Sequence, residues 1–337
     1  MQRKKETRQL GDLLRRMDGP VLVLSTKAGL GNYAVGKAIE QALPGHVAVY
    51  HLSIEDLVPK KLVERDFDRY RQICSRYPFL LKFIYRVPLS YLQKYLRECV
   101  LKDLHLERLR ETILSMGVRT LFATNHRAAF WAGALRRRKE INCSLWALLT
   151  DYHMNSGWKF LFWNEIDRFL GPIRYQRISS CPAGRYTEIP LPVLKEYHDL
   201  SERPGDPHQV LITGGGWGLG RLWNVAVTLH EGCPALTLHV VCGDNEALYR
   251  KLSEQFRGDT GIRLYRQVDS LAPLMEQCAA VITKPGAVTM TEAFVARRAL
   301  FLIRGLPVTE QENALYAIEH FGARRFSMRS FVEWWEL

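Results

Sequence analysis

Two blocks of this sequence share one plan, an apolar strand followed by a glycine-bearing turn and a helix. The first block is "VLVLSTKAGLGNYAVGKAIEQAL", from Val21 to Leu43, and the second, "VLITGGGWGLGRLWNVAVTL", begins at Val210. In each block a short apolar run changes, across the glycines, into apolar residues at helical spacing. Strand–turn–helix units of this kind build Rossmann-like domains, whose parallel strands end at a ligand site. The chain is therefore expected to contain two such domains.

The rest of the chain extends the same plan. Further strand-like runs alternate with helical ones, and this alternation predicts βαβ units and parallel sheets; the runs are Val47–His51, Thr120–Ala123, Leu145–Leu149, Leu238–Val241, Val281–Thr283 and Leu300–Ile303. A Pro- and Gly-rich stretch that begins at Gly171 is expected to hold a linker. With 337 residues, about twice the usual domain size, we predict an α/β protein of two Rossmann-like domains, residues 1–190 and 191–337, with sheets facing a central cleft.

Composition sets the broad class. Hydrophobic residues make up 47% and charged residues 24% of the chain, which is ordinary for a soluble globular protein. The charged N-terminus lacks the apolar core of a signal peptide, so a cytosolic protein is expected. The seven cysteines are scattered without a CxxC pair, which favours buried thiols over a zinc site or a disulfide framework. A net charge of +12 is compatible with nucleic acid, an anionic membrane or a phosphorylated small molecule as partner.

The second glycine turn has the features of a phosphate site. Its glycines, at 214, 215, 216, 218 and 220, let another molecule approach the backbone closely, and the helix expected from Leu222 would present unpaired N–H groups. A tight turn that only serves the packing of the sheet is the alternative. The stretch "VITKPGAVTMTEAFVARRALFLI" adds a second strand, glycine turn and helix, with Glu292 about one turn into that helix. A carboxylate there can accept both ribose hydroxyls, although it can also be a solvated surface Glu. Together the two stretches favour a nucleotide site.

Several segments of the sequence, taken in order, resemble those of a known family. The segments "GGGWGLG", "HVVCGDNEAL", "VDSLAPLM", "TKPGAVTMTEA" and "LPVTEQENA" look like successive C-terminal motifs of the MurG-like glycosyltransferases, closest to the monogalactosyldiacylglycerol synthase and diacylglycerol glucosyltransferase group. "TNHRAAF" and "LLTDYHMNSGW" match that family's N-terminal blocks in order. The resemblance implies a GT-B fold, an N-terminal domain that binds the acceptor and a C-terminal domain that holds a nucleotide sugar, commonly UDP-linked.

The same resemblance implies a set of site residues. In the family, the counterparts of Gly286 to Thr289 lie against the donor diphosphate and that of Glu292 binds the ribose. A Pro-Gly-Gln-Glu run followed by Asn lines the donor sugar; here Val308 and Thr309 replace its Gly and Gln, while Glu310 and Asn313 remain. The donor-binding residues predicted on this basis are Gly214, Gly215, Gly216, Trp217, Gly218, Lys284, Gly286, Ala287, Val288, Thr289, Glu292, Thr309, Glu310 and Asn313.

The first glycine turn is expected to face the acceptor, through Gly29, Leu30, Gly31 and Asn32. The family places a histidine at position 32 and another at position 155, and this chain has asparagine at both. An amide is not a general base near neutral pH. Other groups near strand ends must then take the acceptor proton, and the predicted candidates are Asp151, His126 and His153. A cap for Asp151 and structural hydrogen bonding for the two histidines are the alternatives.

Two further stretches bear on a metal site and on membrane binding. The "DFD" at Asp66–Asp68 lies in a helical pattern, so its carboxylates do not face one ion, and neither a metal nor another cofactor is expected. The aromatic stretch Asp68–Leu96 carries Arg76, Lys82 and Arg86 among its cations and has no apolar run long enough to cross a bilayer. It reads either as an amphipathic surface that enters an anionic membrane interface or as a core helix with a charged face, and the resemblance favours the membrane. The basic residues match no known nucleic-acid-binding motif.

The sequence therefore predicts an inverting GT-B glycosyltransferase. It would move a sugar from a nucleotide donor, UDP-linked by resemblance, to a hydroxyl of a lipid or other hydrophobic acceptor, at the inner face of the plasma membrane. Two alternatives stay open: a non-catalytic partner subunit that binds a nucleotide sugar, suggested by Asn32 and Asn155, and a nucleotide-sugar epimerase of the same architecture.

Overall fold

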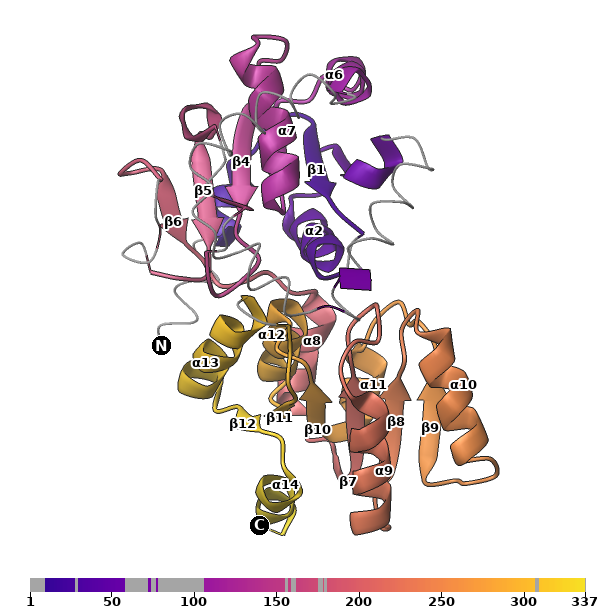
Figure 1. The fold of residues 1–337 in the computed structure, drawn as a ribbon. Helices are drawn as coiled ribbons and strands as arrows, with labels where there is room; N and C mark the ends of the chain where they lie inside the picture. Colours follow the sequence, from indigo (N-terminus) through magenta and orange to yellow (C-terminus); the bar gives the residue numbers. More distant parts are fainter. Residues whose placement is uncertain are drawn as a thin grey trace. The chain divides into compact units, whose positions relative to one another are not determined.

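The computed structural model describes residues 10–27, 30–57, 72–73, 77, 106–154, 157–158, 162–174, 178, 181–306 and 309–336. The chain forms two compact units: residues 1–28 and 32–192 belong to the first, and residues 29–31 and 193–337 belong to the second. Each unit contains one parallel sheet flanked by helices (Figure 1).

The sheet of the first unit has six parallel strands in the order β2-β1-β3-β4-β5-β6. Its elements are β1 (Val21–Ser25), α2 (Gly31–Ala42), β2 (Val49–Ser53), η1 (Ile54–Leu57), α6 (Leu106–Ser115), β3 (Thr120–Ala123), α7 (His126–Arg137), β4 (Ser144–Leu148), η3 (Trp163–Glu165), β5 (Arg168–Gly171) and β6 (Tyr186–Glu188). The interior strand β1 is fully buried, because helices cover both faces of a doubly wound sheet. Its apolar run is therefore continuous rather than alternating.

The second unit repeats this arrangement with the order β12-β11-β10-β7-β8-β9, again all parallel. Its elements are α8 (Lys195–Asp199), η5 (Leu200–Glu202), β7 (Asp206–Thr213), α9 (Leu222–Gly232), β8 (Thr237–Val241), α10 (Glu246–Gln255), β9 (Ile262–Tyr265), α11 (Ala272–Gln277), β10 (Cys278–Thr283), α12 (Ala287–Val295), β11 (Ala299–Leu302), α13 (Thr309–Phe321), β12 (Arg324–Arg325) and α14 (Met328–Trp335). The apolar face of α9 is the predicted one: Leu222, Val225, Ala226 and Leu229 are buried.

The α/β fold class and the parallel sheets predicted from the sequence are confirmed. The stretch expected to hold a linker also contains β6 and α8, and its last residues open β7. The final helix, α14, packs within the second unit, where Phe331 is fully buried against Phe301 at 5.2 Å between ring centroids. Among the described residues the five cysteines are buried and free. The aromatic stretch Asp68–Leu96 and the Asp66–Asp68 motif lie outside the described residues, apart from three positions of the former.

Candidate functional site

The turn after β7 in the second unit has the backbone that its glycines predict. Gly215 and Gly218 adopt φ values of +71° and +56°, a region that side chains rarely enter. The Gly218 amide donates to the Gly215 carbonyl at 2.9 Å, and the Gly215 amide donates to the Thr213 hydroxyl at 3.3 Å. A Cβ on Gly218 would also collide with the Cys242 carbonyl. The turn is thus tightly closed at a strand end, and Trp217 lies half-buried within it.

Lys284 connects this turn to the second glycine turn, which follows β10. A Cβ placed on Gly215 would lie 3.4 Å from Lys284 Cε, and one on Gly286 would lie 3.3 Å from Lys284 Nζ. The ammonium is paired with the Glu310 carboxylate, and the two side chains are only 18% and 9% exposed. A largely buried cation therefore lies close to the backbone of both glycine turns.

The helix that follows this turn supplies a second source of positive potential. α12 begins after Gly286, and no side chain of the described residues caps its N-terminus. The first amides of a helix have no partner within it, and the helix dipole places partial positive charge there. Uncapped amides next to a buried ammonium form an arrangement suited to a phosphate group.

Glu292 lies inside α12 and is buried, with 7% of its surface exposed. Burial raises the pKa of its carboxyl to about 7, the Tyr197 hydroxyl opposes this rise through a hydrogen bond, and the charge of Glu196 adds to it. Tyr197, on α8, is itself fixed, because its hydroxyl accepts from the Leu271 amide at 3.2 Å and lies 3.3 Å from Ser270 Oγ. The solvated surface Glu considered from the sequence is therefore wrong, and the position holds a carboxyl that can be charged or neutral near neutral pH.

The predicted sugar-contacting residues at the start of α13 are engaged in holding the turn after β10. Besides its pairing with Lys284, the Glu310 carboxylate accepts the Leu306 amide. Asn313 is 1% exposed and donates from Nδ2 to the Pro285 carbonyl at 3.3 Å. Thr309 is the first residue of α13, and Val308 lies outside the described residues.

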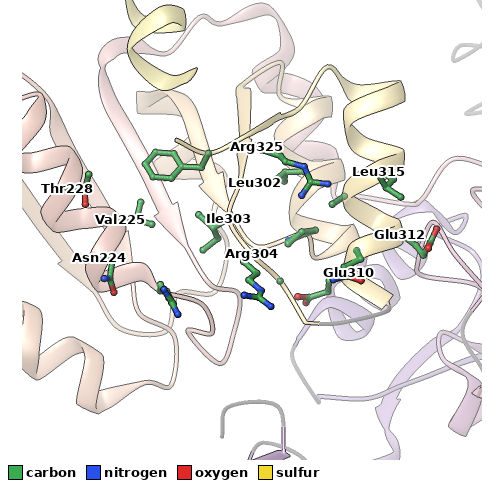
Figure 2. A pocket seen from close by; sticks show the side chains of 16 residues that line it. Asn224, Val225, Thr228, Leu302, Ile303, Arg304, Glu310, Glu312, Leu315 and Arg325 are labelled. Atoms are coloured by element: carbon green, nitrogen blue, oxygen red, sulfur yellow. The ribbon is translucent and has the colours of Figure 1, made fainter. Parts of the chain in front are cut away.

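Beside these residues lies a cavity of about 780 Å³ that the sequence analysis did not predict (Figure 2). Glu310 and Pro285 form part of its wall, which places it next to the Lys284 turn. Arg221, Arg304 and Arg325 line it as well, from the start of α9, the segment after β11 and β12.

In the first unit, Asn32 lies at the ends of two strands. Its side-chain oxygen accepts a hydrogen bond from Thr150 Oγ1 at 2.6 Å, and its carbonyl accepts from Thr124 Oγ1 at 3.1 Å. Thr124 and Thr150 directly precede the segments that hold His126 and Asp151. The structure thus brings the segments of the predicted acceptor turn and of the predicted bases to one edge of the sheet. Of the other turn residues, Leu30 has a φ of +63°, Gly31 begins α2, and Gly29 lies outside the described residues.

The three candidate bases differ in environment. His126 is the first residue of α7, and its ring meets Trp158 edge-on at 6.0 Å between centroids. Burial, with a smaller contribution from the charge of Arg127, lowers the pKa of His126 to about 4, so its imidazole is neutral at pH 7 and a weak base. Asp151 and His153 lie in the bend after β4, both half-buried, and Asn155 is outside the described residues.

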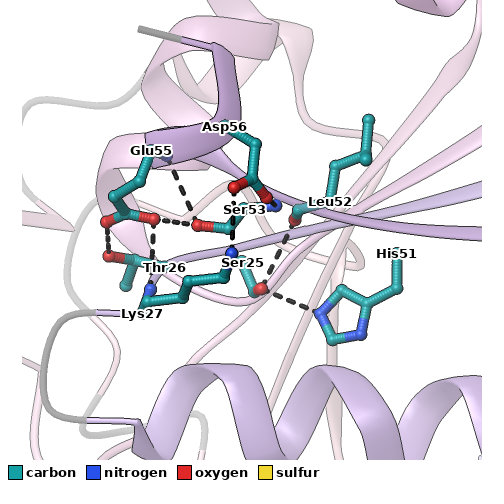
Figure 3. Close-up of polar contacts among 8 residues, drawn as sticks. All are labelled: Ser25, Thr26, Lys27, His51, Leu52, Ser53, Glu55 and Asp56. Atoms are coloured by element: carbon teal, nitrogen blue, oxygen red, sulfur yellow. Dashed lines mark hydrogen bonds and ion pairs between the residues drawn. The ribbon is translucent and has the colours of Figure 1, made fainter. Parts of the chain in front are cut away.

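A hydrogen-bonded cluster that the sequence did not reveal fixes the strand entering the first turn (Figure 3). Ser25 Oγ lies 2.8 Å from His51 Nε2, and His51 Nδ1 lies 3.4 Å from the Glu40 carboxylate, an order that matches a Ser-His-Glu triad. Ser25 is fully buried, however, so no substrate reaches its hydroxyl. Next to it, the Glu55 carboxylate accepts from the Lys27 amide at 3.1 Å and from the hydroxyls of Thr26 and Ser53. The cluster is therefore a structural support for the turn.

Burial also lowers the pKa of His51, against the opposing charge of Glu40. The described residues contain no group of three or more His, Cys, Asp or Glu side chains placed to hold a metal ion. Within the same residues, no helix has both the length and the apolar character needed to cross a bilayer.

Comparison with solved structures identifies the fold. MurG of Acinetobacter baumannii superposes with a TM-score of 0.52 at 15% identity, covering 92% of this chain and 86% of that one. The UDP-GlcNAc 2-epimerase of Neisseria meningitidis, solved bound to UDP-GlcNAc, superposes with a TM-score of 0.53 at 10% identity over 94% and 90% of the two chains. The chain has the GT-B fold. At these identities the likeness shows the fold alone.

Sequence comparison finds similar glycosyltransferases among curated proteins. The chain is 28% identical over 198 residues to a processive diacylglycerol beta-glucosyltransferase of Bacillus mycoides, and 24% identical over 197 residues to that of Bacillus cytotoxicus. Each match covers 54% of this chain and 50% of the relative, so the chain spans about half the length of the curated relatives it matches. No family model matches. The predicted resemblance to MurG-like GT-B glycosyltransferases is confirmed.

Proposed function

We propose that this GT-B protein is an inverting glycosyltransferase that moves a sugar from a UDP-linked donor to a hydroxyl of a lipid or other hydrophobic acceptor. The observation that carries the proposal is Lys284, a buried ammonium beside both glycine turns and ahead of the uncapped start of α12. The similarity to diacylglycerol glucosyltransferases supports sugar transfer over the other activities of the fold. The non-catalytic partner subunit and the epimerase are the alternatives.

The donor would be held by the second unit. Its diphosphate lies against the glycine turn Gly214–Gly218 and the first amides of α12, with Lys284 opposite its charge. The ribose hydroxyls donate to Glu292, whose carboxyl is fixed beside Tyr197. When the bond from the anomeric carbon to the phosphate oxygen breaks, the electron pair leaves on UDP, and the ammonium and the helix amides stabilise the added charge.

The acceptor hydroxyl would attack the anomeric carbon from the opposite face, which inverts its configuration, and its proton must pass to a base. Among the three candidates, Asp151 ranks first because an ionised carboxylate is available at neutral pH without tuning. His126 ranks below it, since a pKa near 4 makes the imidazole a weak acceptor of protons. Asn32, which donates or accepts hydrogen bonds but takes no proton, would orient the acceptor turn through Thr150.

The acceptor would be reached at a membrane surface. The diacylglycerol-acting relatives and the cations of the Asp68–Leu96 stretch support peripheral association with the inner face of the plasma membrane.

Incubation with a panel of UDP-sugars and hydroxyl acceptors, including diacylglycerol in vesicles, tests the proposal. Transfer predicts free UDP in amounts that match the glycosylated product. An epimerase would interconvert the sugar without releasing UDP in step with a glycoside. A non-catalytic partner would bind UDP and leave every donor unchanged, and either result would refute the proposed activity.

A further inference from the structure

The cavity beside the Lys284 turn carries an excess of unpaired positive charge (Figure 2). Arg221, Arg304 and Arg325 line it, and none of the three guanidiniums is paired with a carboxylate of the described residues. Of the two glutamates in its wall, Glu310 is neutralised by Lys284, so Glu312 is the one unpaired acidic residue among the described lining, against three arginines. Like charges in one cavity repel one another, and an anion relieves that repulsion.

The remaining lining gives the character of the ligand. Asn224, Thr228 and Gln311 present neutral hydrogen-bonding groups, and Glu312 presents an acceptor for hydroxyls. Arginine forks bind carboxylates and phosphates with two parallel hydrogen bonds. A volume of about 780 Å³ lies within the range of small-molecule sites and exceeds the need of a simple ion. The lining therefore suits a molecule that combines several hydroxyls with an acidic group.

The position of the cavity links this ligand to the donor. Pro285, which lies between Lys284 and Gly286, forms part of its wall, as does Glu310 at the start of α13. Of the residues predicted to contact the sugar, Glu310 pairs with Lys284 of this turn, and Asn313 donates to the Pro285 carbonyl within it. A sugar attached to a diphosphate at this turn thus has the arginine-lined cavity beside it.

We propose that the cavity receives the donor sugar and that this sugar is acidic, a hexuronate whose carboxylate is bound by Arg304 and Arg325. The inference rests on the proposed function, and it names the substrate class of the same site. Gln311 and Glu312 would then contact the ring hydroxyls.

The short strand β12 provides a matched pair of variants. Its two residues pair with successive residues of β11, Phe301 with Arg324 and Leu302 with Arg325. Neighbouring residues of a strand point to opposite faces, and Leu302 and Arg325 line the cavity whereas Phe301 and Arg324 do not. Arg325→Gln therefore removes one charge from the cavity, and Arg324→Gln removes one charge next to it.

The experiment measures the affinities of UDP, UDP-glucose and UDP-glucuronate by calorimetry. We expect the parent protein to bind UDP-glucuronate at least tenfold more tightly than UDP-glucose. Arg304→Gln and Arg325→Gln should each reduce that preference about tenfold and leave UDP affinity unchanged, while Arg324→Gln should keep the preference. Circular dichroism melting curves identify any variant that fails to fold, and Arg304→Lys then replaces Arg304→Gln, because lysine keeps the charge but loses the paired hydrogen bonds.

Two outcomes overturn the inference, and they are distinguishable. If UDP binds but the two sugar donors bind equally, or if the preference survives in Arg304→Gln and Arg325→Gln, the acidic-sugar assignment fails and the proposed function stands. If UDP itself does not bind, the proposed function fails and the inference fails with it.

Discussion

Replacement of Glu292 by Gln should make the second unit more stable and a poorer binder of UDP. Burial raises the pKa of this carboxyl from 4.5 to about 7, so the folded state loses stability as the pH rises through that interval. At 1.36 kcal/mol per pKa unit, the loss at pH 8 is about 3 kcal/mol, and Glu292→Gln avoids it. Below pH 4.5 the carboxyl is protonated in both states, and the stability difference should vanish.

Binding should change in the opposite direction. The carboxylate can accept two ribose hydroxyls, and each charge-assisted hydrogen bond contributes about 1.5–3 kcal/mol. Glu292→Gln loses the charge but keeps one acceptor oxygen, and Glu292→Ala loses both. UDP affinity should therefore be lower in Glu292→Gln than in the parent protein, and lowest in Glu292→Ala. A residue that lowers stability and raises affinity is expected at a functional site.

The assay is urea unfolding between pH 4 and 8, read by pulsed hydrogen exchange on peptides from the second unit, alongside calorimetric titration with UDP. Glu254→Gln, which changes an exposed glutamate on α10, is the matched control and should alter neither quantity. A Glu292→Gln protein with parental stability at pH 8 would show that the carboxyl is not buried as described. Unchanged UDP affinity in Glu292→Ala would remove Glu292 from the nucleotide site.

The remaining predictions concern the buried ion pair, the base and the membrane. Lys284→Met leaves the Glu310 carboxylate buried without its cation and should destabilise the second unit by about 3–5 kcal/mol, whereas the double variant Lys284→Met/Glu310→Gln should recover most of this loss in the same unfolding assay. The three candidate bases are tested in steady-state transfer assays with the variants Asp151→Asn, His126→Ala and His153→Ala. Substitution of the residue that acts as the base should lower turnover by a factor of about 10² or more with little change in donor affinity, and near-parental turnover in all three variants would exclude a protein base. The protein should sediment with anionic liposomes and be released by salt, since each cation near the surface contributes on the order of 1 kcal/mol to membrane binding. Equal binding by a variant that lacks the charges of Arg76, Lys82 and Arg86 would contradict this prediction.

The sequence predicted those parts of the fold that have a local signal. The strand, turn and helix around Gly214–Gly218 were predicted to the correct buried residues, because a buried parallel strand and an amphipathic helix have distinct periods. β9 was missed because its short run, Ile262–Tyr265, contains an arginine and follows a glycine. β12 was missed because it consists of two arginines that pair with β11 at the edge of the sheet.

In the candidate site, too, only the residues that lie within one local motif could be predicted from the sequence. The glycine turns and Glu292 lie within single motifs and were found, and the resemblance to a family supplied their roles. The raised pKa of Glu292 comes from its burial in the folded unit, and the Tyr197 hydroxyl that opposes the rise lies on a helix nearly a hundred positions earlier in the chain, so no local pattern indicates either. The arginine cavity is built from five separate segments, and each arginine on its own has the sequence context of a solvated surface residue.

The central claim is that the Lys284 turn of the second unit holds the diphosphate of a nucleotide. Calorimetric titration with UDP and with uridine, which lacks the phosphates, tests it most directly. We predict that the parent protein binds UDP at least tenfold more tightly than uridine, and that this ratio collapses in the Lys284→Met/Glu310→Gln variant, whose fold should be retained. Equal affinities for UDP and uridine in the parent protein, or a ratio that the double variant leaves unchanged, would contradict the claim.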